Sequence, residues 1–371
     1  MSTTTSAIAE LAATGKPIGV GIIGLGAADS WAATSHKPAL EAVDGYELRA
    51  LSASSSESAS RWGEVHGISR TFGTADDLAA CDEVDLVIVA VKVPHHLELV
   101  TSVLEAGKPV LCEWPLGNGL AEAEQMAALA REQSVPTAVG LQARSHPAVR
   151  YLGSLVDDGY VGEVLSTTVV GSGGTWGGQI VPRNRYTLDV TKGASLLTIP
   201  FGHTLDGFAS ALGEPQDLQI RQARRRTASR DAETGEMVPM TVPDQIVASG
   251  TLPGGAVATF HYRGGMSRAT NFRWEINGAE GDIVVTASTG HLQLATPTVE
   301  GARGAEKYLS PLPVPAEFIQ VPTLDPVAQA PAYAVAHAYQ QLLADLREGT
   351  SLVPDFTHAV QRHRSIAVAA H

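Results

Sequence analysis

The chain has little cysteine, no excess of positive charge and no long apolar segment, and each of these absences excludes a class of protein. Among 371 residues there are two cysteines, Cys81 and Cys112. They can form neither a disulfide framework nor a metal-ligand pattern, which fits a reducing, cytoplasmic environment. The net charge of −13 argues against a nucleic-acid partner, because phosphates require a basic surface. No apolar run approaches the roughly 20 residues that span a membrane, so we expect no membrane partner.

The first 15 residues are rich in threonine and alanine and carry no basic segment. Such a stretch does not resemble an export signal. We expect residues 1–15 to form a loose N-terminal arm.

The most informative segment is a glycine-rich turn that follows an apolar run. Residues 18–23 read as a buried parallel strand, which breaks at Gly24 and Gly26, and Ala27 follows. Such a turn brings backbone N–H groups close to the pyrophosphate of a dinucleotide. The third glycine position of the pattern is Asp29, so an ordinary strand–helix turn remains an alternative.

Strand and helix signals alternate through residues 16–146, which predicts an α/β Rossmann domain with a parallel sheet. From residue 147 onward short strands follow one another, and helical sequence returns near the C-terminus. We therefore expect residues 147–371 to form an α+β domain for substrate binding and oligomerisation. Its sheet should be large, open and mostly antiparallel, with residues 297–331 irregular and the C-terminal helices included. An open sheet needs cover, so a homodimer or homotetramer formed through it is expected.

Several motifs are similar to those of one known family. They are Gly24-Leu-Gly26, Val93-Pro94-His95-His96, Glu113-Trp114-Pro115, residues 140–147, Gly202-His-Thr-Leu-Asp206 and residues 276–281. Together they resemble the Gfo/Idh/MocA oxidoreductases, NAD(P)-dependent enzymes that act mostly on sugars. The resemblance covers residues 18–370.

Two departures from the family pattern concern catalysis. Trp114 stands where the family usually has the lysine of Glu-Lys-Pro, and a tryptophan neither accepts nor donates the hydroxyl proton. The family's aspartate before the histidine is replaced by Thr198 or Ile199, which leaves His203. The Glu-Trp pair resembles a branch that includes the yeast galactose-regulon repressor and NAD-dependent glycosidases.

The resemblance implies roles for individual residues. His203 is the expected base and Tyr186 a second acid or base, although both could be packing residues. Cofactor contacts are implied for Gly24, Gly26, Ala27, Ser54, Val93, Pro94, His96, Glu113, Trp114 and Gln142. Substrate contacts are expected from Arg144, Trp176, Arg183, Arg185 and Asp206. Arginines suit an anionic sugar, and surface placement is the alternative. We expect no metal, because no acid or cysteine completes a site beside His95 and His96.

The cofactor itself is expected to be NAD, with NADP also compatible. After the second strand, where NAD enzymes place an acid for the ribose, the chain has Ser52-Ala-Ser-Ser-Ser56. Small hydroxyl groups there neither repel nor strongly attract a 2′-phosphate.

Three functions fit these observations. The first is a sugar-active enzyme that transfers hydride from a ring carbon to NAD(P). The second is an NAD-dependent glycosidase for an anionic glycoside such as a sulfoquinovoside. The third is a sensor of sugar or dinucleotide without catalysis, like the galactose-regulon repressor.

Overall fold

The computed structural model describes residues 14–368, which form two units. Unit 1 contains the chain up to Leu141 together with Val321–His363, and unit 2 contains Gln142–Gln320 and the residues from Arg364 onward. Most of the expected N-terminal arm, residues 1–13, lies outside the described residues.

Unit 1 is built on a six-stranded parallel sheet in the order β3-β2-β1-β4-β5-β6. The strands are β1 (Ile18–Ile23), β2 (Tyr46–Ser52), β3 (Arg70–Phe72), β4 (Leu86–Val89), β5 (Val110–Glu113) and β6 (Thr137–Gly140). This is the strand order of a dinucleotide-binding doubly wound domain, with its switch point between β1 and β4. The three-residue strand β3 is too short to give a sequence signal and was not expected.

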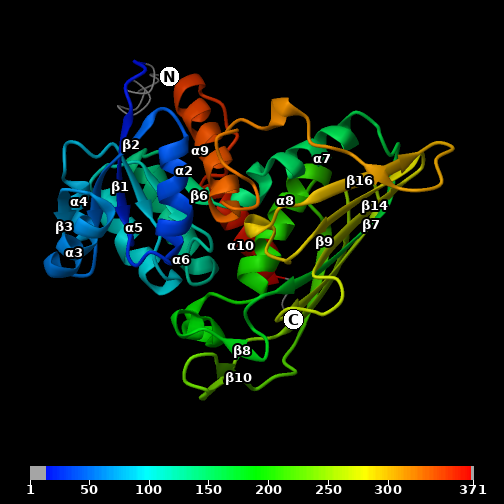
Figure 1. Cartoon of the computed structure of the whole chain (residues 1–371), viewed down its shortest axis with the longest axis horizontal. Coiled ribbons are helices and arrows are strands. Elements are labelled where there is room, and N and C mark those ends of the chain that lie inside the picture. The colour runs from blue at the N-terminus through cyan, green and yellow to red at the C-terminus, as the bar shows by residue number, and fades with distance from the viewer. Residues whose placement is uncertain (1–13, 369–371) are drawn as a thin grey trace. The chain divides into compact units, whose positions relative to one another are not determined.

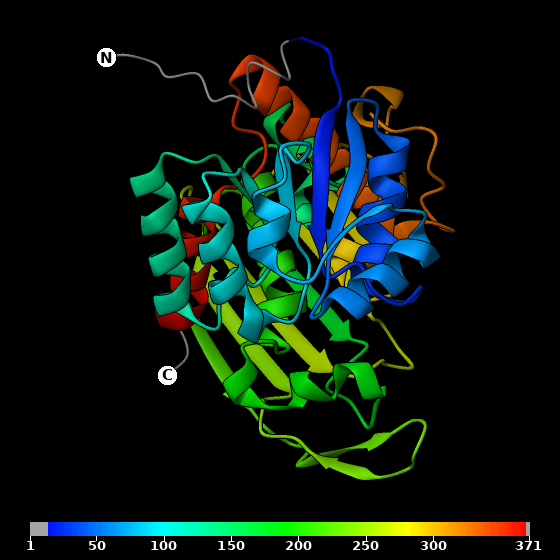
Figure 2. The ribbon, with the colours of Figure 1, turned by 90° about the vertical axis from the view of Figure 1, so that its left-hand side faces the viewer.

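Helices cover both faces of this sheet, as Figure 2 shows for its blue and cyan strands. They are α2 (Lys37–Ala42) with the preceding turn η1 (Ala32–His36), α3 (Ser56–His66), α4 (Ala75–Ala79), α5 (His96–Glu105), α6 (Leu120–Gln133) and α9 (Ala330–Glu348). Helix α10 (Phe356–Val368) begins in unit 1, and its residues from Arg364 onward belong to unit 2. The central strands β1 and β4 are apolar and buried on both sides and β5 is buried throughout, as a covered parallel sheet requires, whereas the outer strands β2 and β3 carry exposed residues.

The C-terminal helices differ from expectation, because residues 321–363 belong to unit 1 and not to the second domain. Helix α9 packs on η1 and α2 and is also hydrogen-bonded to the first residue of β2. The Tyr46 hydroxyl donates to the Tyr339 carbonyl over 3.0 Å, and both side chains lie in the apolar core of the Rossmann unit. Helical periodicity predicts an apolar face but not which sheet that face covers.

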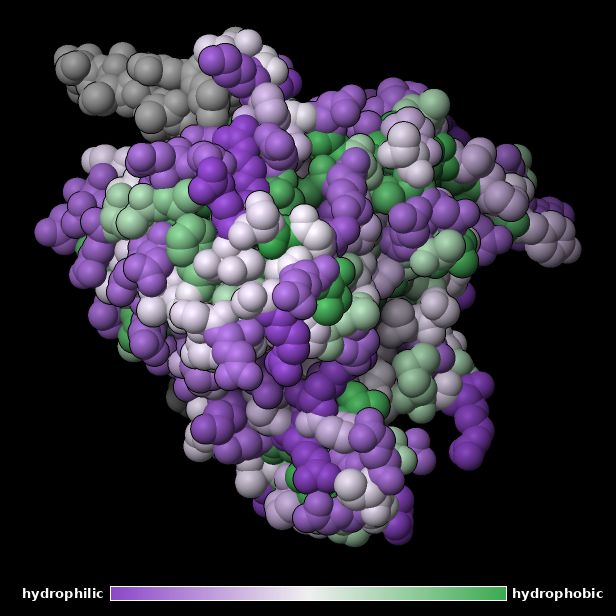
Figure 3. Space-filling model, turned by 60° about the vertical axis from the view of Figure 1, so that its left-hand side comes forward, coloured by the Kyte–Doolittle hydropathy of each residue, from purple (hydrophilic) through white to green (hydrophobic). Residues whose placement is uncertain are grey.

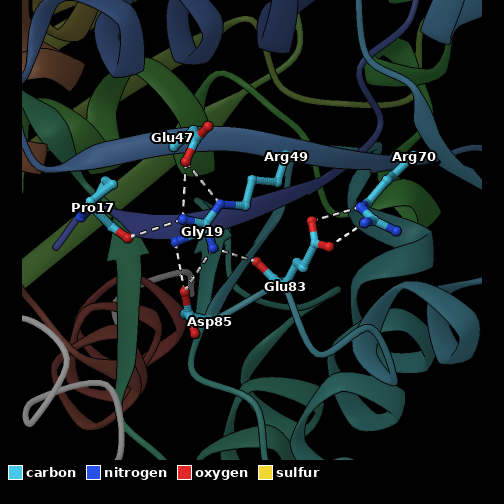
Figure 4. A network of polar contacts seen from close by, with 7 residues as sticks. All are labelled: Pro17, Gly19, Glu47, Arg49, Arg70, Glu83 and Asp85. Carbon is cyan, nitrogen blue, oxygen red and sulfur yellow. Dashed lines mark hydrogen bonds and ion pairs between the residues drawn. The ribbon is translucent and has the colours of Figure 1, made fainter.

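A network of charges fixes the amino ends of the strands in unit 1 (Figure 4). The Arg49 guanidinium donates to Glu47 over 3.0 Å and to the Glu83 carbonyl over 3.1 Å. Asp85 accepts from the Gly19 amide over 2.7 Å. Ligands of such folds bind at the opposite, carboxyl ends of the strands, so this network serves stability.

Unit 2 contains an eight-stranded sheet in the order β17-β16-β15-β14-β7-β13-β12-β9, antiparallel except for the β7–β13 pair (Figure 1). The strands are β7 (Val164–Gly173), β9 (Gln216–Ala223), β12 (Gln245–Thr251), β13 (Val257–Gly264), β14 (Phe272–Gly278), β15 (Gly281–Ala287), β16 (Thr298–Arg303) and β17 (Ser310–Pro311). The expected fold class, a parallel Rossmann domain followed by a mostly antiparallel α+β domain, is confirmed. Strand β16 lies inside the segment that we expected to be irregular.

A small three-stranded sheet belongs to the same unit, formed by β8 (Gln179–Ile180), β10 (Ala228–Asp231) and β11 (Met237–Pro239). The helices are α7 (Pro147–Asp157) and α8 (Gly202–Leu212). Helix α8 packs on the inner face of the large sheet, where the Phe208 ring stacks on Trp274 at 5.4 Å. On the other face Val247 and Val257 are each about half exposed.

The described helices include none that is long and apolar enough to cross a membrane. On the face drawn in Figure 3, hydrophilic residues are widespread and apolar ones form small groups. This scatter is ordinary for a protein surface.

We predict that Gly171→Ala destabilises unit 2. A Cβ at this position would lie 2.2 Å from the ring of Tyr262, which is fully buried and hydrogen-bonded to Thr204 over 2.6 Å. Overpacking of this kind costs about 1–3 kcal/mol. The midpoint of thermal unfolding should fall by about 5 °C. Gly178→Ala is the control, because a Cβ there meets nothing within 4 Å; equal midpoints for the two variants would contradict the prediction.

Candidate functional site

A cavity of about 560 Å³ opens at the carboxyl ends of β1, β2 and β4 in unit 1. It is lined by Ile23, Gly24, Leu25, Gly26, Ser52, Ala53, Ser54, Ser58, Trp62, Gly73, Thr74, Ala75, Asp76, Val91, His95, Glu98, Leu99 and Ser102. Its size is within the range of small-molecule sites, and it lies at the switch point of the sheet. The expected cofactor residues Gly24, Gly26 and Ser54 are among its lining.

The turn after β1 can hold its shape only with glycine. Gly24 has φ +103°, and a Cβ there would lie 2.5 Å from the carbonyl oxygen of Ala90. At Gly26 the nearest atoms to a Cβ belong to the Trp62 ring, 3.9 Å away, so the backbone itself faces open space. Bare backbone beside a cavity fits the close approach of a pyrophosphate. The residues present therefore fit a dinucleotide.

The segment after β4 presents His95 to the cavity and turns His96 inward. Val93, Pro94 and His95 form the turn η2 (Val93–His95), and His96 is 1% exposed. The His96 Nε2 lies 3.1 Å from the Val91 carbonyl and its Nδ1 3.0 Å from that of Pro115. Burial lowers the pKa of His96. Its imidazole thus ties together the loops that follow β4 and β5.

Glu113 and Trp114 lie at the end of β5 with partners from unit 1. The Glu113 carboxylate lies 3.1 Å from His36 Nε2, and the His36 Nδ1 lies 2.5 Å from the Tyr339 hydroxyl. Trp114 is buried, and its ring packs at 4.5 Å against that of His363. The buried Trp114 indole therefore contributes to packing, and it does so at the position where the family expected from the sequence usually has a lysine.

In unit 2, buried polar side chains from three segments converge. The turn η3 (Gln142–Ser145) and the turn η7 (Leu292–Leu294) both pack on α8 and on each other. Within the described residues, neither amide atom of Gln142, nor Nδ1 of His203, nor Oε1 of Gln293 has a hydrogen-bond partner, and each side chain is at most 4% exposed. Buried polar atoms are nearly always hydrogen-bonded in proteins. Atoms left over in one cluster indicate a place for a polar ligand.

The electrostatics of this cluster keep its histidines neutral. Burial lowers the pKa of His203 to about 3, and the nearby Asp206 carboxylate opposes that shift while His291 adds to it. Burial also lowers the pKa of His291 to about 4. Asp206 is fully buried, and its Oδ2 lies 3.6 Å from Arg144 Nε. The cluster therefore holds uncharged imidazoles beside one compensated ion pair.

His291 and Gln293 were not expected from the sequence. The His291 ring stacks on Trp176 at 5.9 Å and 11°, and Gln293 Nε2 lies 3.4 Å from His291 Nδ1. No local motif marks these residues, because the loop after β15 reaches α8 only through the folding of the sheet.

The loop η4 (Pro182–Leu188) carries three of the expected site residues. Burial raises the pKa of Tyr186, so its phenol is protonated at neutral pH and serves as a donor. Arg183 is exposed, whereas the Arg185 guanidinium lies 2.7 Å from Asp231 and 3.1 Å from Glu236. Arg185 thus links η4 to strand β10 of the small sheet through an ion pair with Asp231. In the described part of the chain, no three His, Cys, Asp or Glu residues could hold a metal ion.

Comparisons with known proteins bear on both units. Residues 18–141 match the profile described as "Oxidoreductase family, NAD-binding Rossmann fold", and residues 147–287 match "Gal80p, C-terminal domain". The galactose/lactose metabolism regulatory protein GAL80 of Saccharomyces cerevisiae is 29% identical over 300 residues, which cover 75% of this chain and 69% of that protein. Dehydrogenase aclE of Aspergillus oryzae is 38% identical over 205 residues, 54% of this chain and 56% of that one.

Solved structures share the fold over nearly the whole chain. A super-repressor mutant of Gal80p from Saccharomyces cerevisiae superposes with a TM-score of 0.84 at 25% identity, covering 95% of this chain and 94% of that one. Levoglucosan dehydrogenase in complex with NADH and levoglucosan gives a TM-score of 0.78 at 18% identity, covering 96% and 97%. The resemblance and the NAD cofactor expected from the sequence are confirmed. The chain joins a Rossmann domain that matches the NAD-binding domain of the Gfo/Idh/MocA oxidoreductases to a domain that matches the C-terminal domain of Gal80p.

Proposed function

We propose that the protein is an NAD-dependent enzyme that oxidises a ring hydroxyl of a sugar or glycoside, with unit 2 holding the sugar and His203 accepting the hydroxyl proton. The observation that carries this proposal is the buried Nδ1 of His203, which has no hydrogen-bond partner among the residues that the structure describes, on a neutral imidazole. Dehydrogenases among the relatives support the reaction type, including the D-xylose 1-dehydrogenase [NADP(+)] of Haloarcula marismortui, 32% identical over 162 residues.

The chemistry can be assigned to groups of this chain. Bound NAD supplies a hydride acceptor. As hydride leaves the carbon, the hydroxyl proton becomes that of a protonated carbonyl, which is acidic enough for a weak base such as His203 to remove. The Asp206 carboxylate stabilises the imidazolium that forms, since it already opposes the lowering of the His203 pKa. The Gln142 amide and the Gln293 Oε1, which have no hydrogen-bond partner among the described residues, would bind further hydroxyls, and Tyr186 would donate a hydrogen bond.

Two other functions remain as candidates. A regulatory sensor is favoured by the GAL80 relatives and by the buried Trp114 in the lysine position. Net glycoside hydrolysis through the same hydride chemistry, on an anionic glycoside, is the other. Of the arginines considered for such a substrate, Arg185 already binds two carboxylates and Arg144 pairs with Asp206. A homodimer or homotetramer formed through the open sheet, where Val247 and Val257 are half exposed, also remains part of the proposal.

We predict that His203→Ala lowers turnover by about 10²–10⁴-fold while leaving NAD affinity within twofold, because the imidazole moves a proton and lies outside the cofactor cavity. The protein is incubated with NAD and a panel of sugars and glycosides, and both reduced cofactor and released aglycone are followed.

Net reduced cofactor supports a dehydrogenase, and aglycone release without it supports a glycosidase. Tight NAD binding with neither product supports a sensor. His358→Ala on α10 is the control, and full activity of His203→Ala would remove the assignment of His203.

We predict that His203 makes stability pH-dependent below its unfolded pKa of about 6.5. The unfolded chain takes up a proton there that the folded chain, with the His203 pKa at about 3, does not bind. This contribution to stability is therefore fully present above pH 6.5 and is lost as the pH falls toward 3. In urea unfolding at pH 7 to 4, His203→Gln should lose less stability than wild type, by up to about 1.4 kcal/mol per pH unit. If the free energy of unfolding fell equally with pH for His203→Gln and wild type, the prediction would be refuted.

We also predict that Ser54→Asp selects NAD over NADP. Ser54 lines the cavity after β2, where an acid would accept from the ribose diol and repel a 2′-phosphate. Calorimetry should show NADP affinity at least tenfold weaker and NAD affinity unchanged or stronger. An equal change for both cofactors would place the ribose elsewhere.

A further inference from the structure

The turn that follows β1 lacks the third glycine of its motif, and helix α3 contacts that turn instead. One stripe of α3 carries Ser58, Trp62 and His66, which are four residues apart and so share a face. Ser58 and Trp62 line the cavity. His66 Nε2 lies 2.6 Å from the carbonyl oxygen of Gly26, where the imidazole N–H donates.

Helix α3 is fixed at both ends and packs closely on β3, so the face with Ser58, Trp62 and His66 can support the turn after β1. The Ser55 hydroxyl accepts from the Ser58 amide at its start, and Gly67 ends it in the left-handed conformation with φ 73°. A Cβ at Gly63 would lie 2.4 Å from Thr71, which shows how closely the helix approaches β3. The Arg61 guanidinium lies 4.8 Å from the centre of the Trp62 ring and covers that side chain.

The hydrogen bond from His66 fixes a peptide plane of the turn. In a planar trans peptide the carbonyl and the following N–H point in opposite directions. When the Gly26 carbonyl is bound by His66, the Ala27 N–H is directed away from α3. Ala27 is one of the residues expected to donate to the pyrophosphate.

We propose that His66 is a positioning residue for the dinucleotide, which orients the Gly26–Ala27 peptide from α3 and so replaces the support that the third glycine normally gives. Trp62 and Ser58 complete this support from the same helix face. The inference rests on the NAD-binding domain and not on the sugar chemistry proposed for unit 2.

The test compares His66→Gln with His66→Met, two unbranched side chains of similar size of which only glutamine can donate to the Gly26 carbonyl. Both lose the imidazole, so any general loss of packing is shared. We expect calorimetry with NAD to give a dissociation constant about three- to tenfold higher for the Met variant than for the Gln variant. Glu64→Gln, an exposed position on the same helix, should behave as wild type.

A second titrant separates positioning from general stability. The difference between the Gln and Met variants should persist with ADP-ribose, which has the pyrophosphate, and should shrink to less than twofold with adenosine, which lacks it. Equal NAD affinities for the two variants, or an equal difference for adenosine, would overturn the proposal.

Discussion

The close contact between the backbone after β1 and the backbone after β4 is the constraint on which the cofactor domain depends. Gly24 adopts a left-handed conformation and lies so near the Ala90 carbonyl that no side chain could be accommodated. Because the strand order reverses between β1 and β4, the loops that follow these two strands diverge and leave a cavity between them. Other interactions in unit 1 hold the loops at the carboxyl ends of the strands, beside the cavity, and the strands at their amino ends.

The two edges of the sheet are held by different interactions. At the amino ends, Arg49 and Asp85 bind backbone and side-chain groups in a half-exposed network, in which single ion pairs are worth about 1 kcal/mol or less. At the carboxyl ends, the loops are held by the buried imidazoles of His96 and His36. His96 joins the loops after β4 and β5, and His36 binds Glu113. A buried polar bond is costly to break, so the cavity edge is fixed more strictly than the exposed one.

Unit 2 contains a cluster of buried polar atoms that have no hydrogen-bond partner among the described residues. Gln142, His203 and Gln293 come from three separate segments, and burial keeps the imidazoles of His203 and His291 neutral. A cluster like this costs folding energy unless a ligand supplies the missing hydrogen bonds. This cost in folding free energy is consistent with a site for a polar, hydroxyl-rich molecule. The Arg144–Asp206 ion pair adds little net charge to the site.

The sequence by itself determined the class of both units and the cofactor turn. Apolar runs and glycine positions are local properties, so the strands from Ile18 and the turn at Gly24 could be read directly. What the tertiary structure alone decided are contacts between distant segments. The packing of α9 on the Rossmann sheet, the pairing of His291 with Trp176 and the inward turn of His96 in place of His95 are such contacts. Their cause is the surface that each segment meets after folding, which no spacing of residues along the chain encodes.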